Sequence, residues 1–175
     1  MRKQIFVDNP TEFHDLWGRA TAGLRLLQRA PQQEVVYFDS AIVTTRYFYQ
    51  FVNDLFRFAN VAADSFAYVG LRPDPVGYFF HHFSKFPAII FQPTDSEADY
   101  CTMLQADPGG SPADALAFNT WAYVVLPSSG DWIAYGDDSN EIAVFSGAPE
   151  KVNEFARATL ARDIVRPAPD FKLID

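Results

Sequence analysis

Residues 121–145 read WAYVVLPSSGDWIAYGDDSNEIAVF, and this stretch decides the fold. It holds three apolar runs rich in β-branched and aromatic residues, which favour strands. The runs are residues 121–126, 131–135 and 141–145. Short segments of Pro, Gly, Ser, Asp and Asn, typical of turns, separate them. Strands joined by short turns run antiparallel, so the stretch predicts a three-stranded meander. In the first run, the residues that would face either side of the sheet are apolar. We therefore expect this strand at the centre of the sheet, with Trp121 and Val124 in the core.

Amphipathic helices are predicted near both ends of the chain. Asn9 precedes Pro10 and stands three residues before Glu12, an arrangement typical of a capped helix start. Apolar residues then recur at helical spacing, at Phe13, Leu16, Trp17, Ala20, Leu24 and Leu27. Pro31 ends this helix, and a last helix begins at residues 149–150.

Between these helices the pattern predicts strands and shorter helices. We expect strands at residues 35–38, 66–71 and 88–91, an extended segment at 77–83 and a helix at 43–60. Thr94 with Glu97 is expected to open a short helix through Leu104, and a brief helix is expected to start at residues 111–114 and to run to Phe118. Helices therefore cluster at the two ends, with strands in the middle and the late third. This order predicts an α+β fold, with an antiparallel or mixed sheet covered by the N- and C-terminal helices. A length of 175 residues predicts a single domain over residues 1–175.

Composition and charge narrow the classes of partner and location. The chain has 14 Lys and Arg against 22 Asp and Glu, which gives a formal net charge of −8. An acidic surface repels phosphate, so we expect neither a nucleic acid nor an anionic membrane as partner, whereas a basic protein partner is compatible. Cys101 is the single cysteine, so no intrachain disulfide forms. The apolar stretch behind the first residues is too short for a signal peptide, so we expect a cytoplasmic protein.

Known catalytic and metal-binding motifs do not occur in the sequence. It has no Gly-rich phosphate loop and no Gly-x-Ser-x-Gly motif. The acidic segment at residues 137–141 suggests calcium, but counting from Asp137 the sixth residue is Ile142 where an EF-hand needs Gly. One cysteine and three scattered histidines do not make a zinc site. We therefore expect no metal and no cofactor.

His81 and His82 are the basis of an alternative hypothesis. In a strand, neighbouring side chains point to opposite faces, so the two do not readily bind one metal. One of them is expected to be packed and the other exposed, or one acts as a general base or ligand. With Tyr47 and Tyr49 from the aromatic helix, they would line the pocket of a small enzyme or ligand-binding protein. Core packing also explains the aromatic helix, and a buried, inert thiol explains Cys101.

One stretch resembles a known family. Residues 131–137, DWIAYGD, are followed by EIAVF at 141–145 and by a helix that begins Pro-Glu. Over residues 131–160 this is similar to the C-terminal half of small bacterial immunity proteins. Those proteins neutralise a toxin by binding it and are not enzymes. The resemblance implies a non-catalytic, protein-binding function, which leaves the oligomeric state open.

The acidic turn is the predicted binding site. Asp137, Asp138 and Glu141 concentrate negative charge at a hairpin tip, and loops often carry binding function. Trp132 and Tyr135 on the adjoining strand complete the candidate set. We expect these charges to be exposed and to steer a basic protein toward the turn. The competing interpretation is that the same residues only shape the turn.

Overall fold

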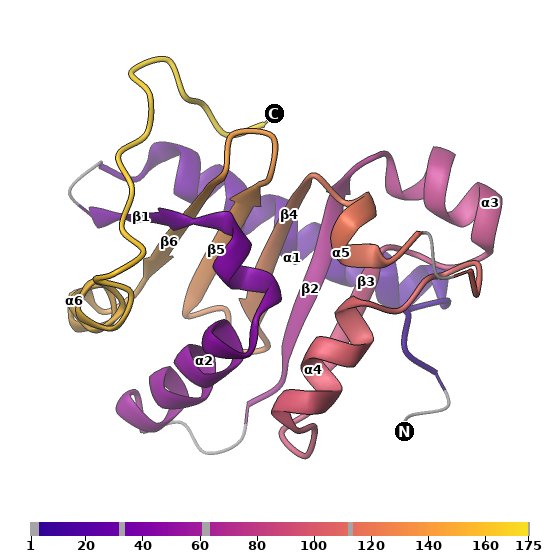
Figure 1. Cartoon of the computed structure of the whole chain (residues 1–175), viewed down its shortest axis with the longest axis horizontal. Helices are drawn as coiled ribbons and strands as arrows, with labels where there is room; N and C mark the ends of the chain where they lie inside the picture. Colours follow the sequence, from indigo (N-terminus) through magenta and orange to yellow (C-terminus); the bar gives the residue numbers. More distant parts are fainter. Residues whose placement is uncertain (1–3, 32–33, 61–63, 112–113, 175) are drawn as a thin grey trace.

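A six-stranded antiparallel sheet forms the centre of the protein in the computed structural model (Figure 1). The structure describes residues 4–31, 34–60, 64–111 and 114–174. The strands are β1 Val36–Asp39, β2 Phe66–Arg72, β3 Ala88–Phe91, β4 Ala122–Pro127, β5 Trp132–Asp137 and β6 Ile142–Gly147. Their order in the sheet is β1-β6-β5-β4-β2-β3, and each neighbouring pair is antiparallel. The predicted α+β fold with a C-terminal meander and helices near both ends is confirmed.

Helices cover both faces of this sheet. The α-helices are α1 Pro10–Arg29, α2 Arg46–Phe58, α3 His81–Phe83, α4 Glu97–Leu104, α5 Leu116–Asn119 and α6 Glu150–Thr159. A 3₁₀ helix, η2 Ser40–Thr44, precedes α2, and a π-helix, η3 Pro75–Phe80, precedes α3. In Figure 1, α1 lies behind the sheet, whereas α2, α4 and α6 lie in front of it. Among the described residues, no helix combines the length and apolarity needed to cross a membrane.

The first helix begins as its sequence predicts. Asn9 caps α1, because its side-chain oxygen accepts hydrogen bonds from the backbone N–H groups of Thr11 at 2.8 Å and Glu12 at 3.2 Å. The buried stripe of α1 then packs on β2, β4 and β5. Side chains of the C-terminal segment, among them Phe171 and Ile174, pack against the same core cluster. This face of the sheet is thus shared by the two ends of the chain.

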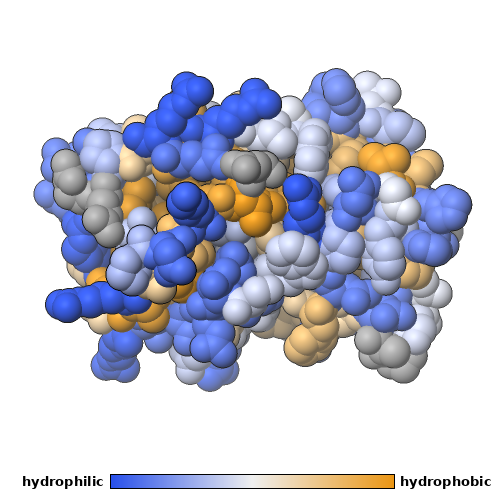
Figure 2. Space-filling model, turned by 90° about the horizontal axis from the view of Figure 1, so that it is seen from above, coloured by the Kyte–Doolittle hydropathy of each residue, from blue (hydrophilic) through white to orange (hydrophobic). Residues whose placement is uncertain are grey.

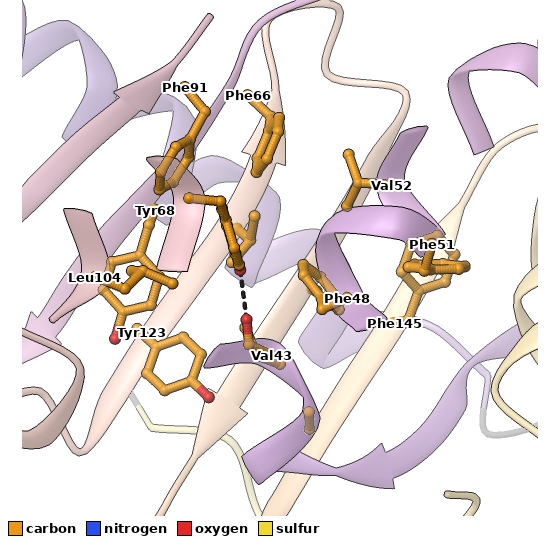
Figure 3. Close-up of a cluster of buried hydrophobic side chains, with 14 of the residues drawn as sticks. Val43, Phe48, Phe51, Val52, Phe66, Tyr68, Phe91, Leu104, Tyr123 and Phe145 are labelled. Atoms are coloured by element: carbon orange, nitrogen blue, oxygen red, sulfur yellow. Dashed lines mark hydrogen bonds between the residues drawn. The ribbon is translucent and has the colours of Figure 1, made fainter. Parts of the chain in front are cut away.

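Aromatic side chains dominate the opposite face. Phe51 of α2 packs edge-on against Phe145 of β6, and the rings of Tyr68 and Tyr123 stack with centroids 4.7 Å apart (Figure 3). The hydroxyl of Tyr100 on α4 donates to the carbonyl of Val43 in η2, which is the dashed line in Figure 3. Packing of these aromatic side chains against the sheet stabilises α2 as a helix, although aromatic residues have only modest helix propensity.

Two expectations for individual segments are wrong. Residues 77–83 are helical rather than extended, because the side chain of Asp74 accepts from the N–H groups of Val76 and Gly77 and Pro75 occupies the first helical position. Trp121 precedes β4 and is 43% exposed, so it is not a core residue. Val124 is fully buried between β2 and β5, as expected for the central strand.

The shorter helices begin later than their sequences suggested. Ser96 caps α4 in a capping box with Asp99, in place of Thr94 with Glu97. The helix expected at 43–60 divides into η2 and α2, with Thr45 as the cap of α2. The last short helix, α5, begins at Leu116, and residues 112–113 lie outside the described chain.

Candidate functional site

A cavity of about 380 Å³ lies at the end of the sheet that is uppermost in Figure 1. Four elements form it: η2 after β1, the end of α4, the helix α5, and the turn between β5 and β6. Its polar lining includes Asp39, Ser40, Gln105, Asp138 and Glu141. Seen from above, this end of the molecule is largely hydrophilic and carries separate hydrophobic patches (Figure 2).

Asp138 is the carboxylate most closely tied to the core. It is half-buried, and the hydroxyl of Tyr123 donates to its Oδ1 at 3.3 Å. Burial raises the pKa of Asp138, and the nearby carboxylates of Asp137 and Asp39 raise it further. Hydrogen bonds from Ser40 and Tyr123 act in the opposite direction and favour the charged form. The structure thus places a partly desolvated acid in the wall of the cavity.

Asp39 and Glu141 bring two more carboxylates to this cavity. Asp39 ends β1 and caps η2, because its Oδ1 accepts from the N–H of Ala41 at 2.9 Å. Glu141 is exposed and has a left-handed backbone, with φ at 56°. The carbonyl of Glu141 accepts from the N–H of Ser40 at 3.4 Å, which ties the turn to η2. The strand register brings Asp39 and Glu141 together, since Asp39 of β1 pairs with Ile142 of β6, the residue that follows Glu141.

Two exposed aromatic side chains accompany the acids. Phe118 of α5 lines the cavity and is 84% exposed. Trp121 follows shortly after α5, and its carbonyl accepts from the N–H of Asp138 at 3.0 Å. The backbone therefore holds Trp121 beside the acidic turn. Single exposed apolar residues are ordinary, but two large aromatics beside converging carboxylates form a chemically distinct surface.

The predicted binding residues divide into two groups. Asp138 and Glu141 line the cavity, whereas the side chains of Trp132, Tyr135 and Asp137 are buried. Trp132 and Tyr135 also pack on opposite faces of the sheet, because residues at an odd spacing in a strand alternate. The expectation of a fully exposed acidic tip is therefore wrong.

Asp137 shapes the turn instead. It is only 4% exposed, and its carboxylate accepts from the backbone N–H of Asn140 at 3.1 Å and from its side-chain amide at 2.8 Å. The hydroxyl of Tyr135 donates to the same carboxylate at 3.4 Å. Burial raises the pKa of Tyr135, and Asp137 raises it further. These contacts agree with the competing interpretation, in which the residue organises the hairpin.

The residues of the alternative pocket lie apart. His81 and His82 are both exposed on α3, with ring centroids 5.0 Å from each other. Tyr47 is exposed on α2, and the hydroxyl of Tyr49 donates to the carbonyl of Asp95. Figure 1 places α3 and α2 on opposite sides of the molecule. The structure does not bring the two histidines together with these tyrosines.

Two other kinds of chemically active site are a reactive thiol at Cys101 and a cluster of metal-binding side chains. Burial raises the pKa of the partly buried Cys101 thiol, and Glu97 raises it further, so the reactive thiolate is disfavoured. Within residues 4–31, 34–60, 64–111 and 114–174, no group of three or more His, Cys, Asp or Glu is placed to hold a metal ion.

Sequence reasoning missed Asp39, Ser40 and Phe118. No local motif marks them, because they reach the acidic turn only through the pairing of β1 with β6 and the packing of α5. Comparison of the chain with protein-family models, curated proteins and solved structures found no match to any of them. Fold and site together define an α+β protein with an open antiparallel sheet and an acidic, aromatic-edged cavity at one end.

Proposed function

We propose that this protein is a non-catalytic binding protein that recognises a basic protein partner at the acidic cavity. The observation that carries the proposal is the convergence of Asp39, Asp138 and Glu141 on one cavity whose lining includes the exposed ring of Phe118. In the same proposal the protein acts in the cytoplasm, consistent with its single cysteine.

Charge complementarity selects the kind of partner. Three carboxylates around a concave surface attract a cationic side chain, and the net charge of −8 strengthens that attraction at long range. Such charges chiefly accelerate encounter and exclude acidic competitors. The guest we propose is one Arg or Lys side chain of the partner, which pairs with Asp138 inside the cavity.

The aromatic edge supplies the affinity that exposed charges lack. Phe118 and Trp121 present large, rigid surfaces, and residues of this kind are frequent anchors of protein interfaces. An arginine held by a carboxylate also gains from stacking on a neighbouring ring. Phe118 is therefore the residue that we expect to matter most for the lifetime of the complex.

The resemblance to immunity proteins suggests a more specific role. It rests on residues 131–160, which include the acidic turn at one side of the cavity. A toxin with a basic active surface is a partner of the required charge. In the proposed role, the protein neutralises such a toxin by covering that surface.

A random-peptide display library provides the test, with the intact protein as bait. We expect the recovered 12-residue peptides to be rich in Arg and Lys. The double variant Asp39→Asn/Asp138→Asn should weaken their binding at least tenfold, because Asn keeps the shape and the capping oxygen but loses the charge. Asp131→Asn is the matched control, since Asp131 is exposed at the β4–β5 turn, the opposite end of the sheet.

Two results would contradict the proposal. One is the recovery of peptides without basic residues. The other is equal affinity of the double variant and of Asp131→Asn. Thermal melting of each variant verifies that a loss of binding does not reflect unfolding.

A further inference from the structure

The C-terminal segment, residues 163–174, wraps around one edge of the sheet. In Figure 1 it is the yellow trace that rises from α6 past β1 and then arches back. The N–H of Asp39 in β1 donates to the carbonyl of Asp163 at 2.9 Å. The N–H of Val165 donates to the carbonyl of Tyr37 in β1 at 3.1 Å. The start of the segment therefore lies along the outer edge of β1.

The far end of the segment is attached as well. The carbonyl of Ile174 accepts from the side-chain amide of Gln28 on α1 at 2.8 Å. The ring of Phe171 meets the ring of Tyr37 edge-on, with centroids 6.5 Å apart. Residues 166–172, which we call the arch, are thus held on both sides. Because the arch is restrained before any guest enters, binding beneath it costs less conformational entropy.

A cavity of about 510 Å³ lies between the arch and the acidic turn. The arch lines it with Arg166, Asp170 and Lys172. The turn lines it with Asn140 and Glu141. Small-molecule sites occupy roughly 300–1,000 Å³, so this space is large enough for a small organic guest.

Part of the cavity wall is apolar. Ile142 is buried, and Val165 and Phe171 are half-buried. Apolar walls combined with a few polar groups are typical of sites that bind small molecules. This part of the wall suits an aliphatic or aromatic group of a guest.

Unpaired charges of opposite sign lie on the two sides of the cavity. Arg166 and Lys172 of the arch are exposed, and so is Glu141 of the turn. Within the described residues, no ion pair joins either cation to Glu141. Asp170 offsets one of the two cations, so the arch side keeps a positive charge. A guest that carries both signs would satisfy both sides at once, through charge-assisted hydrogen bonds.

We infer that the cavity beneath the arch binds a zwitterionic α-amino acid with an apolar side chain. The α-carboxylate pairs with Arg166 and Lys172, since a guanidinium matches the geometry of a carboxylate. The α-ammonium pairs with Glu141, and the apolar side chain packs on Ile142 and Phe171.

This site is separate from the proposed protein-binding cavity. Ile142 and Phe171 belong to the core on the α1 face of the sheet, whereas Leu104 and Ala117 of the acidic cavity belong to the core on the opposite face. Glu141 lines both cavities, because the turn lies between them. The inference does not depend on the proposed function.

The test is a titration of the ¹⁵N-labelled full chain with L-phenylalanine, followed by NMR. We expect a saturable shift of the backbone amide signal of Phe171, whereas the indole signal of Trp132, at the far end of β5, stays in place. 3-Phenylpropionate lacks the ammonium group and phenethylamine lacks the carboxylate, so each should bind beneath the arch roughly tenfold more weakly. The indole signal of Trp121 reports separately on any cation that enters the acidic cavity.

Charge-removing variants complete the experiment. Arg166→Gln should weaken L-phenylalanine binding about tenfold. Arg162→Gln should leave it unchanged and is the matched control, since Arg162 is exposed and is not among the described residues that line the cavity. Arg166 is exposed too, so neither replacement threatens the fold. Equal affinity for the three compounds, equal binding by the two variants, or no saturable shift at Phe171 would overturn the inference.

Discussion

The hydroxyl of Tyr123 connects the aromatic core to the acidic turn. Its single hydrogen is shared between Oδ1 of Asp138, at 3.3 Å, and the carbonyl of Ser40, at 3.2 Å. The ring itself stacks on Tyr68 and passes over Gly136, where a Cβ would collide with it. One side chain of β4 thus fixes the position of an acid in the cavity and of the 3₁₀ helix opposite.

We predict that Tyr123→Phe weakens both the fold and the order of the cavity. The variant leaves the carbonyl of Ser40 without this donor, so the free energy of unfolding should fall by about 1 kcal/mol. The pKa of Asp138 should rise further, because the hydrogen bond from Tyr123 favours its charged form. Urea denaturation and a carboxylate NMR titration measure the two effects.

Tyr47→Phe is the matched control for that substitution. Tyr47 is exposed on α2, so the loss of its hydroxyl should leave stability within about 0.5 kcal/mol of wild type. Equal stability of the two variants would show that the Tyr123 hydroxyl contributes nothing to the fold.

The raised pKa of Asp138 makes stability depend on pH in a defined direction. The folded state holds this proton more tightly than the unfolded chain does, so the contribution is fully present below the ordinary aspartate pKa of 3.8. It is lost as the pH rises through the raised folded value. Asp138→Asn removes the effect, so the variant should gain stability relative to wild type between pH 3.5 and pH 7.

Denaturant titrations of both proteins at several pH values measure that difference. The same titration governs the proposed interaction, since a protonated Asp138 no longer attracts a cation. Binding of a basic peptide should therefore weaken as the pH falls through the raised value. A stability difference between wild type and Asp138→Asn that is constant with pH would contradict the assigned shift.

Local signals explain why most elements were predictable. The cap at Asn9 and the stripe that follows it act within α1 alone, and the meander is a succession of neighbouring strands joined by short turns. Each of these features depends on residues close together in the chain. The sequence pattern therefore predicted their positions to within a few residues.

The errors arise where a local signal has two interpretations. Asp74 and Pro75 lie in a Pro-rich segment whose composition is typical of a break between elements, yet together they begin η3. The aromatic residues that follow favour strands by propensity, and the cap at Asp74 together with packing against the core overrides this preference. The cavity was beyond sequence reasoning, because Asp39 and Asp138 meet only through the non-local pairing of β1 with β6.

We predict that Asp74→Ala destabilises the segment from η3 to α3. The substitution removes the acceptor for the N–H groups of Val76 and Gly77, and the loss of a helix cap costs about 1 kcal/mol. Asp74→Asn retains a capping oxygen and is the control, with most of the stability preserved. Hydrogen exchange of the amides in η3 measures the local effect, and identical protection in the two variants would rule out a capping role.

Because Val124 is buried and Trp121 is exposed, a substitution should destabilise the fold strongly at Val124 and only weakly at Trp121. Val124→Asp places a charge in a fully buried site between two strands, which should cost several kcal/mol and abolish cooperative melting. Trp121→Ala should cost about 1 kcal/mol, well below the roughly 3–5 kcal/mol of a buried Trp. Thermal melting distinguishes the two, and a Trp121→Ala variant as unstable as Val124→Asp would place Trp121 in the core.

The acidic turn should separate into one structural carboxylate and one recognition carboxylate. Asp137→Ala removes the acceptor for Asn140 and for the Tyr135 hydroxyl, so the free energy of unfolding should fall by about 1–3 kcal/mol. Glu141→Gln keeps the exposed side chain and removes only its charge, so stability should be unchanged. Association of a basic peptide with Glu141→Gln should nevertheless slow, most clearly at low salt where screening is weak. Stopped-flow association at two ionic strengths measures the rate. An on-rate equal to wild type at low salt would remove Glu141 from the proposed binding surface.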